Sequence, residues 1–358
     1  MRWDWMGNRT HRNRVKGDSM ETFKDKVAIV TGGAMGIGRT LCQELAARGA
    51  IVIVADLRFD SAEQVAGKLA EGGAKVCAAP LDVSHEPEVT ALIEKTASNY
   101  GHLDYMFNNA GVAIGGDARD LSLEHWRRVF DVNLYGVVYG TIAAYRVMAR
   151  QGSGHIVNTS SAAGLLPQPL NGAYCASKHA VVGLSRGLRI EGADLGVRVS
   201  VICPGYVATN IYENMILVNL PREETVRSLP IRPMSPVRAA HVILHGVSKN
   251  KPVIVLPLLV RLGWYAYRLF PGLADRLAVA RTRSLRNARA PYAMLSNADA
   301  KRSPIRYYEH PRPRTVDGYP VSLGSEGDGS ARGNDEVAPF ERPIHRTDRV
   351  AGDSGGAQ

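Results

Sequence analysis

The feature that most constrains the fold of this chain is a regular alternation of short apolar segments with longer amphipathic ones. Seven apolar runs within residues 26–256 are rich in β-branched side chains and predict strands. They cover residues 27–31, 51–56, 74–80, the start of 103–111, 154–161, 197–205 and 252–256. Runs that are apolar throughout predict a parallel sheet with helices on both faces. Right-handed crossovers then make the sheet doubly wound.

The segments between the strands predict helices, because their apolar residues recur at the helical period. They cover residues 38–49, 61–73, 86–101, 122–152, 172–196 and 235–249. Ser61 and Ser122 are predicted to cap two of these helices, since a serine hydroxyl accepts hydrogen bonds from free backbone N–H groups. The chain is therefore predicted to be an α/β protein with one domain, residues 23–256, and an extra C-terminal segment.

Composition separates the two ends from this domain. Residues 1–22 form a basic leader that is expected to be disordered, and Met20 is a second candidate start. Residues 257–299 form an apolar, arginine-rich extension that is expected to be helical. Residues 300–358 form a tail rich in Pro, Gly, Ser and Arg that is expected to be disordered.

The net charge of +10 does not indicate a nucleic-acid partner, because the excess lies at the ends of the chain. Residues 1–20 carry +3 and residues 261–358 carry +5, which leaves +2 for the span between them. No nucleic-acid-binding motif accompanies either end. No metal site is predicted, because His241 and His245 have helical spacing but no third ligand nearby.

Several observations favour a reducing, cytoplasmic location. The basic N-terminus lacks the apolar segment of a secretory signal, and no apolar run reaches the roughly 18 residues of a spanning helix. The cysteines are widely spaced and mostly lie in apolar runs, as buried free thiols do. They are Cys42, Cys77, Cys175 and Cys203.

A glycine-rich loop, "TGGAMGIG", lies between the first predicted strand and the first helix. Gly32, Gly36 and Gly38 leave the backbone bare where a pyrophosphate would approach the free N–H groups of a helix N-terminus. A Rossmann-like dinucleotide site is therefore predicted.

The cofactor preference depends on the end of the second strand. Asp56 lies 18 residues after Gly38, where a carboxylate can accept hydrogen bonds from the adenosine ribose. A carboxylate there would repel a 2′-phosphate, so NAD is favoured. Arg39 and Arg58 lie close in the sequence and leave NADP open.

Residues 172–187, "GAYCASKHAVVGLSRG", contain two catalytic signatures that exclude each other. Gly183, Ser185 and Gly187 match the G-x-S-x-G elbow of serine hydrolases. That elbow needs a strand and a sharp turn directly before the helix, whereas Ser185 is predicted to lie in the middle of one. The hydrolase interpretation is therefore rejected.

The second signature has the context that its chemistry needs. Tyr174 and Lys178 are four residues apart and share a helix face. A nearby ammonium lowers the pKa of a phenol, which lets the phenol act as a base. Ser161 ends the preceding strand, 13 residues before Tyr174, so its hydroxyl can meet the phenol at the carboxyl edge of the sheet.

Taken together, these motifs resemble the short-chain dehydrogenase/reductase family over residues 24–256. "TGGAMGIG" is similar to the family's cofactor loop, "LDV" to its adenine-contacting segment, "NNAG" to the turn beside its central strand, and "CPGYVAT" to the segment that approaches the nicotinamide. The resemblance implies cofactor contacts by Gly32, Gly36, Ile37, Gly38, Asp56, Asp82, Val83, Asn109, Ala110, Gly111, Tyr174, Lys178, Pro204, Gly205, Val207 and Thr209. It implies catalytic roles for Asn133, Ser161, Tyr174 and Lys178.

The implied activity is NAD(P)-dependent interconversion of a secondary alcohol with a ketone, or of an alcohol with an aldehyde. Tyr174 would exchange the hydroxyl proton, Ser161 would bind the substrate oxygen, and Lys178 would lower the pKa of Tyr174 and hold the nicotinamide ribose. Asn133 would position a water behind Lys178, or would alternatively mark a helix kink. The resemblance also implies a homodimer or homotetramer. A cofactor-binding scaffold that acts through its basic ends is the alternative to an enzyme.

The segment of residues 211–236 is long and irregular, and in this fold such a segment would cover the substrate. Its apolar side chains, with two that follow Ser161, predict an apolar cavity and favour a lipophilic alcohol or ketone (steroid, retinoid, long-chain or terpenoid) over a sugar. They are Ile211, Tyr212, Met215, Ile216, Leu217, Leu165 and Leu166.

Residues 256–286 mix aliphatic and aromatic side chains with arginines. Arg261 and Arg268 are seven residues apart, so they share a helix face. Such a helix suits a membrane interface, with the arginine heads near anionic lipid. A helix that closes the substrate pocket, or one that packs on a neighbouring subunit, is the alternative.

Overall fold

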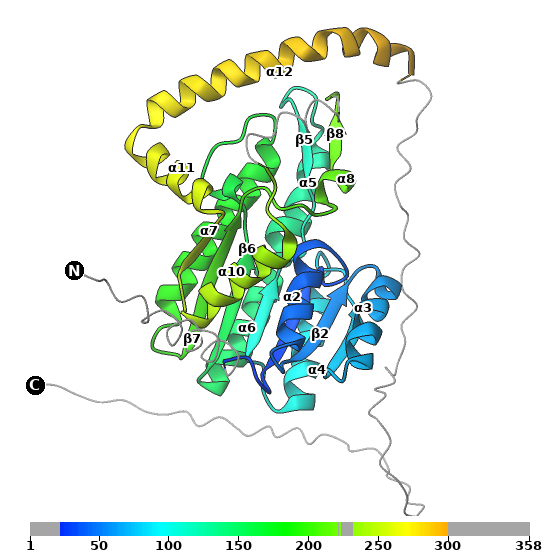
Figure 1. Cartoon of the computed structure of the whole chain (residues 1–358), viewed down its shortest axis with the longest axis vertical. Coiled ribbons are helices and arrows are strands. Elements are labelled where there is room, and N and C mark those ends of the chain that lie inside the picture. Colours follow the sequence, from blue (N-terminus) through cyan, green and yellow to red (C-terminus); the bar gives the residue numbers. More distant parts are fainter. Residues whose placement is uncertain (1–21, 221, 223–231, 300–358) are drawn as a thin grey trace, which may run out of the picture. The chain divides into compact units, whose positions relative to one another are not determined.

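The computed structural model describes residues 22–220, 222 and 232–299 (Figure 1). Residues 1–21 of the predicted leader, with Met20, and the predicted tail of residues 300–358 lie outside this part of the chain. The centre is a seven-stranded parallel sheet of order β3-β2-β1-β4-β6-β7-β9. The strands are β1 (Val27–Thr31), β2 (Ile51–Asp56), β3 (Val76–Pro80), β4 (Tyr105–Asn108), β6 (Gly154–Thr159), β7 (Val197–Pro204) and β9 (Val253–Leu256). The predicted doubly wound sheet of seven strands is confirmed.

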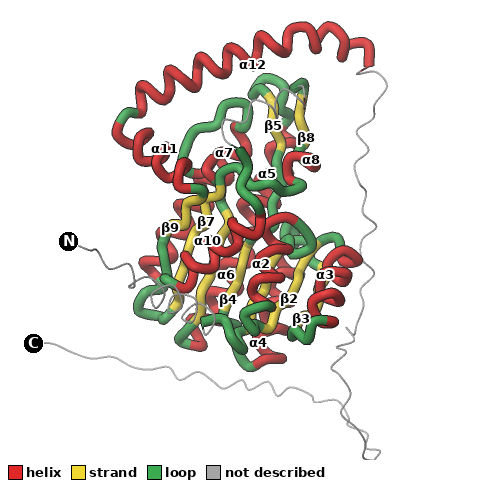
Figure 2. Tube along the Cα trace, in the orientation of Figure 1, coloured by secondary structure: helices red, strands yellow, loops and turns green. Residues whose placement is uncertain are grey.

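Helices cover the sheet on both faces, because alternate side chains of each strand point to opposite sides (Figure 2). In β1, Ala28 and Val30 pack on one side with α2 (Gly36–Ala46), α3 (Phe59–Glu71) and α10 (Pro236–Ser248). Val27 and Ile29 pack on the other side with α4 (Glu86–Tyr100), α6 (Gly136–Gln151) and the end of α7 (Gly172–Glu191). Two apolar cores thus hold the strands between two helical layers.

The order of the strands fixes where a ligand can bind. Chain connections run outward from β1 toward β3 on one side and from β4 toward β9 on the other. The crossovers leave a crevice beyond the carboxyl ends of β1 and β4, which is where ligands bind in open α/β sheets. The glycine loop follows β1, and the "NNAG" turn follows β4.

The predicted helix of residues 122–152 is interrupted. It consists of α5 (Leu123–Phe130), a π-helical segment (Asp131–Tyr135) and α6. Its predicted cap is confirmed, because the Ser122 hydroxyl accepts a hydrogen bond from His125 N at 3.3 Å. The sequence pattern did not predict the π segment, since a single wider turn barely disturbs the helical periodicity.

The predicted cap at Ser61 is wrong. Helix α3 begins two residues earlier, at Phe59, and its N-cap is Arg58. The reason lies in the preceding turn, where the Asp56 carboxylate accepts a hydrogen bond from Arg58 N at 3.0 Å. This bond directs the chain into the helix directly after β2, so Ser61 falls inside the first turn.

A second, two-stranded parallel sheet pairs β5 (Ile114–Gly116) with β8 (Ile216–Val218). It was not predicted, because strands of three residues show no periodic pattern and their partners are far apart in the sequence. The sheet ties the segment after β4 to the segment of residues 211–236, which also contains α8 (Ile211–Asn214). The predicted covering segment therefore has regular structure at its start.

Two helices follow the last strand of the main sheet: α11 (Leu258–Leu269) and α12 (Pro271–Asp299). Helix α11 contacts β9 and α12. In the described part of the chain, no helix combines the length and the apolar character that crossing a membrane would require.

Candidate active site

The glycine loop is bent in the way its sequence suggests. Gly36 has a φ of +54°, and a Cβ there would lie 3.3 Å from Thr209 Cβ. Gly38 lies against Gly32 so closely that a Cβ would collide with the Gly32 carbonyl. The N-cap of α2 is Met35, and no side chain of the described residues caps this helix. Bare backbone at an uncapped helix N-terminus fits the pyrophosphate of a dinucleotide.

Asp56 is held at the end of β2 by two backbone groups. Its Oδ2 accepts from Ala34 N and its Oδ1 from Arg58 N, both at 3.0 Å, and the residue is 7% exposed. Each carboxylate oxygen has two acceptor sites, so both can also accept a ribose hydroxyl. The guanidinium of Arg58 lies close by, with Nη2 2.6 Å from the sulfur of Met35 in the glycine loop.

The "NNAG" turn is fastened to the end of β1. Thr31 Oγ1 accepts hydrogen bonds from Asn109 N at 2.9 Å and from Ala110 N at 3.0 Å. The side chain of Asn109 donates from Nδ2 to Thr31 O at 3.0 Å. A Cβ on Gly32 would lie 2.9 Å from Ala110 Cα. The turn and the glycine loop are therefore packed together over the predicted cofactor crevice.

Asn133 is fully buried in the π-helical segment, and its amide is paired on both sides. Oδ1 accepts from Val112 N and Nδ2 donates to Val112 O, each at 2.8 Å. A Cβ on Gly111 would lie 3.1 Å from Asn133 Oδ1 and 3.6 Å from Lys178 Nζ. Asn133 thus lies in a local irregularity of the helix, beside the predicted catalytic lysine.

The structure brings Ser161, Tyr174 and Lys178 together. The Ser161 hydroxyl lies close enough to the phenol of Tyr174 to influence its pKa, and Lys178 Nζ lies 5.7 Å from the centre of the Tyr174 ring. Lys178 is buried and donates to Thr159 O at 2.9 Å. Ser161 Oγ also contacts Pro204 O at 3.5 Å, which connects the group to the end of β7. Two strands and one helix therefore converge on the phenol.

Burial dominates the electrostatics of this group. It raises the pKa of Tyr174 above its ordinary value, while the hydrogen bond from Ser161 acts in the opposite direction. Burial also lowers the pKa of Lys178 to about 8. The predicted lowering of the tyrosine pKa by Lys178 is not found in the protein alone, because the ammonium faces the ring and Thr159 O. An ammonium has three donors, so Lys178 can also bind a ribose hydroxyl.

The segment after β7 returns to the glycine loop. Gly205 N donates to Leu256 O at 2.7 Å, directly after Pro204 ends the strand. Val207 is buried, and Thr209 lies against Gly36. The carboxyl end of β7 is therefore connected to the proposed pyrophosphate cradle.

Three further predicted cofactor residues lie along the crevice, away from the Ser–Tyr–Lys group. Asp82 Oδ1 accepts from Ser84 N at 2.9 Å and from Ser84 Oγ at 2.6 Å, just beyond β3. Val83 packs against Gly136, and Ile37 packs into the core beneath α2. They flank the crevice at the ends of β3 and β1 and do not touch the Ser–Tyr–Lys group.

Ser185 is part of a buried polar network. It is 1% exposed, donates to Val181 O at 2.7 Å and accepts from Asn158 Nδ2 at 3.0 Å. Asn158 in turn accepts from Asn108 Nδ2 at 2.9 Å and from Thr141 Oγ1 at 3.1 Å. Ser185 lies within α7, as predicted, and its hydroxyl supports the sheet. Sequence reasoning missed the network, although polar residues inside apolar strands were its signal.

An apolar cluster packs against Tyr174. Ile114 of β5 and Val129 of α5 are buried in it, and Tyr174 packs against it. Trp126 belongs to the same cluster and lies 3.6 Å from the Cβ position of Gly172. The sequence pattern did not single out Trp126, because its spacing is that of an ordinary helix residue.

The residues predicted to form the apolar cavity have different surroundings. Leu165 is buried, and Leu166 packs in a cluster on β7. Met215 and Leu217 lie within 3.4 Å of the Cβ position of Gly115, while Ile216 is 43% exposed. The side chain of Tyr212 lies outside the described residues. The covering segment thus contributes apolar atoms over β5.

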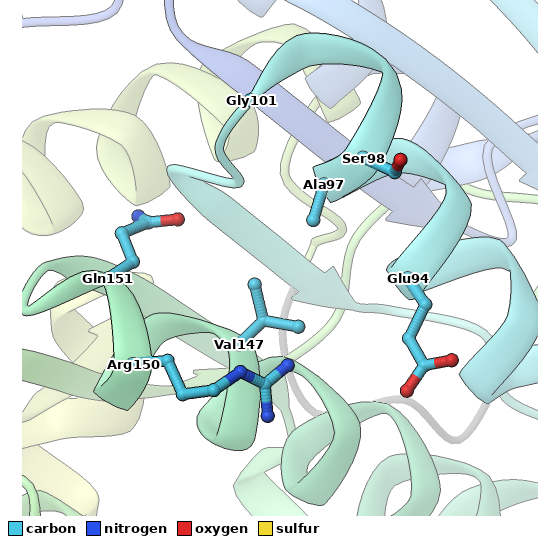
Figure 3. A pocket seen from close by; sticks show the side chains of 7 residues that line it. All are labelled: Glu94, Ala97, Ser98, Gly101, Val147, Arg150 and Gln151. Carbon is cyan, nitrogen blue, oxygen red and sulfur yellow. The ribbon is translucent and has the colours of Figure 1, made fainter.

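A hollow lies at the opposite end of the sheet (Figure 3). It is lined by α4 and by the end of α6, which precedes the amino end of β6. Its residues are Glu94, Ala97, Ser98, Gly101, Val147, Arg150 and Gln151. The hollow contains none of the predicted cofactor or catalytic residues.

The fold and the site define the class of protein: a doubly wound, dinucleotide-binding oxidoreductase. A family model described as short chain dehydrogenase matches residues 26–216. The chain therefore belongs to the short-chain dehydrogenase/reductase family. It is an oxidoreductase that acts on hydroxyl groups, which disfavours the scaffold interpretation.

Two relatives and a solved structure agree with this. The chain is 35% identical over 231 residues to cyclohexanol dehydrogenase of Acinetobacter sp. (strain SE19), covering 64% of this chain and 90% of that protein. It is 37% identical over 188 residues to 3beta-hydroxysteroid dehydrogenase 2 of Eggerthella lenta, covering 52% and 72%. The crystal structure of a short chain dehydrogenase/reductase from Burkholderia phymatum in complex with NAD has a TM-score of 0.65 and 29% identity, covering 70% of this chain and 96% of that one.

Proposed function

We propose that the enzyme interconverts a lipophilic secondary alcohol, most simply one on an aliphatic ring, with its ketone, using NAD. The observation that carries the proposal is the setting of Tyr174. Its phenol lies beside the Ser161 hydroxyl, and its side chain packs against the same apolar cluster as Trp126. When the hydroxyl of a substrate reaches the phenol, the rest of the substrate would therefore lie against apolar side chains, which favours an apolar substrate.

Each residue of the group has a distinct task. Tyr174 removes the proton of the substrate hydroxyl in oxidation and returns it in reduction. Ser161 donates a hydrogen bond to the substrate oxygen, on which charge develops. Lys178 holds the ribose next to the nicotinamide, and Asn133 fixes the turn beside it through Val112. The nicotinamide, when bound, supplies the hydride acceptor, and the positive charge of its oxidised ring favours the phenolate.

NAD is proposed over NADP because of Asp56. A buried carboxylate at the end of β2 accepts ribose hydroxyls and repels a 2′-phosphate. The relative from Burkholderia phymatum was solved with NAD, which supports the same choice. Arg58, on the rim of the loop, is the residue that would have to turn toward a phosphate for NADP to bind well.

The substrate class draws support from relatives. One acts on cyclohexanol, and a third, cis-4-hydroxycyclohexanecarboxylate dehydrogenase of Sinomonas cyclohexanicum, is 38% identical over 190 residues. Their names describe hydroxyls on saturated rings. A steroid hydroxyl has the same local chemistry on a larger body.

Turnover assays test the proposal. Cyclohexanol, a 3β-hydroxysteroid and sorbitol are each supplied with NAD or NADP, and reduced cofactor is followed by absorbance. We expect turnover of at least one cyclic alcohol with NAD and none of sorbitol. Turnover of the sugar alcohol alone would contradict the substrate class, and preference for NADP would contradict the cofactor.

Assembly and location are further parts of the proposal. We propose a cytoplasmic homodimer or homotetramer, as the family resemblance implies. Light scattering coupled to gel filtration measures the assembly, and a monomer at micromolar concentration would contradict it.

A further inference from the structure

Helix α11 has one face that is fixed to the domain. Val260 is 6% exposed and reaches Gly205, where a Cβ would lie 2.5 Å from Val260 Cγ2. Trp264, one turn further on, packs in an apolar cluster with Val253 and Val255 of β9. This face therefore seats the helix beside the carboxyl ends of β7 and β9.

The opposite face of α11 is apolar and exposed. Leu258, Leu262, Tyr265 and Leu269 are 50–72% exposed and follow each other at intervals of four, three and four residues. This spacing places them in one stripe. Phe270, Leu273 and Leu277 extend the exposed apolar surface into α12, with exposures of 61–65%. We call these seven side chains the outer stripe.

Arginines accompany the outer stripe. Residues 258–286 contain six arginines and one acidic residue, Asp275, a net charge of +5. On α11, Arg261 and Arg268 lie one above the other on the flank of the stripe, and the Arg268 guanidinium lies 5.7 Å from the Trp264 ring centre. Arg276 and Arg283 repeat the seven-residue spacing in α12.

We propose that the outer stripe docks on the surface of a membrane that contains anionic lipid. The leucines and aromatic rings would enter the boundary between headgroups and acyl chains, with the arginines extended to the phosphates. The charge selects this occupant, because two copies of the chain meeting through the stripe would bring the arginines that accompany it, Arg261, Arg268 and Arg276, close to arginines of the other copy. The described helices are too short or too polar to cross a membrane, so the proposed contact lies in the plane of the interface between membrane and water.

The two helices that carry the outer stripe contact the domain near the site at two points. Val260 of α11 touches Gly205, which precedes the segment leading to Thr209. Arg286 of α12 donates to Asp117, the residue after β5, at 2.7 Å. Docking would therefore bring the substrate side of the domain close to the bilayer. Only this consequence rests on the proposed function, since binding to lipid can be measured without any substrate.

Vesicle co-sedimentation of the full chain tests the proposal. The probes are vesicles of phosphatidylcholine alone and vesicles with one-third phosphatidylglycerol. We expect the protein to pellet with the anionic vesicles at low salt and to be released by molar salt. The double variant Leu262→Glu/Leu269→Glu should reduce partitioning by at least about tenfold, because it removes two leucines that would enter the membrane interface. Arg268→Gln/Arg276→Gln should reduce it by about tenfold or more on anionic vesicles only.

Two matched variants control for general effects of charge. Val237→Glu changes an apolar residue of α10 that is 51% exposed, and Arg238→Gln removes a neighbouring charge. Both should pellet like the wild type. The proposal is overturned if the wild type stays in the supernatant with anionic vesicles, or if Leu262→Glu/Leu269→Glu pellets unchanged. It is also overturned if the only effect of this double variant is a smaller oligomer in gel filtration. That result would show that a second copy of the chain, and not a membrane, covers the stripe.

Discussion

The guanidinium of Arg286 donates from Nε to Oδ2 of Asp117 at 2.7 Å and so fastens α12 to the residue that follows β5. Arg119 occupies the same carboxylate, with Nε 3.1 Å from Oδ1 and Nη2 3.0 Å from Oδ2. The side chain of Asp117 is 2% exposed, whereas those of Arg119 and Arg286 are 71% and 48% exposed. A single buried charge thus holds the C-terminal helix over the small β5–β8 sheet.

This arrangement predicts acid-sensitive attachment of α12. Hydrogen bonds from Arg119 and then Arg286 hold the pKa of the Asp117 carboxyl well below its usual range. The stabilisation is therefore complete above the unfolded-state pKa of about 3.9 and is lost as the pH falls toward the lower folded value. Arg286→Gln should increase proteolysis within residues 271–299 at neutral pH, and a variant as resistant as the wild type would contradict the attachment. Arg283→Gln is the matched control, since Arg283 belongs to the same exposed helix.

Tyr174→Phe should abolish turnover while cofactor binding stays near the wild-type level. The phenol carries the proton, and loss of general acid–base catalysis costs about 10²–10⁴-fold in rate. The control is Ser185→Ala, which should lower the free energy of unfolding by about 1 kcal/mol and leave kcat unchanged, because Ser185 supports the sheet. The reverse result, with Ser185 required and Tyr174 dispensable, would contradict the assigned roles.

Asp56→Ala should weaken NAD binding and relieve the exclusion of NADP. The measurement is kcat/KM with each cofactor, and the ratio should shift toward NADP by at least tenfold. Arg58→Ala in the Asp56→Ala background should reverse part of that gain. A wild-type enzyme that already prefers NADP would show that Asp56 does not select the cofactor.

His155 should make the fold less stable in mild acid. It is buried, its Nε2 lies 2.8 Å from Ser200 Oγ, and burial together with Arg198 and Arg189 lowers its pKa to about 3. The folded state thus excludes a proton that the unfolded state binds below about pH 6.5. Stability should fall as the pH drops from about 6.5 toward 3, and His155→Gln should show a shallower decline in denaturant titrations. Equal slopes for the two proteins would contradict this role.

Sequence patterns predicted the parts of this protein whose signal is local and repeated. The strands are continuous apolar runs, and Gly36 and Asp56 stand at fixed places relative to strand ends, so both fold and crevice could be predicted. Tyr174, Lys178 and Ser161 were predicted together because helix spacing and the carboxyl edge of the sheet bring them there. The family match over residues 26–216 confirms the family.

Long-range partners could not be predicted in the same way. The β5–β8 pairing, the shared apolar cluster of Trp126 and Tyr174, and the bond from Arg286 to Asp117 each join segments whose separate patterns are ordinary. The balance of effects on the pKa of Tyr174 in the protein alone could not be predicted for a related reason. The helix spacing shows that an ammonium lies near the phenol, which would lower the pKa of Tyr174. Burial by the surrounding elements raises that pKa, and the extent of burial cannot be read from the spacing.

The polar network of Asn108, Asn158, Thr141 and Ser185 joins β4, β6, α6 and the helix that carries the catalytic tyrosine. An unpaired member would leave a desolvated amide or hydroxyl, so these elements are expected to open as a single cooperative unit. Amide protons of β4, β6 and the middle of α7 should therefore exchange at one common slow rate. The catalytic centre would then persist until the protein unfolds globally, and heat should abolish turnover and native structure at the same temperature.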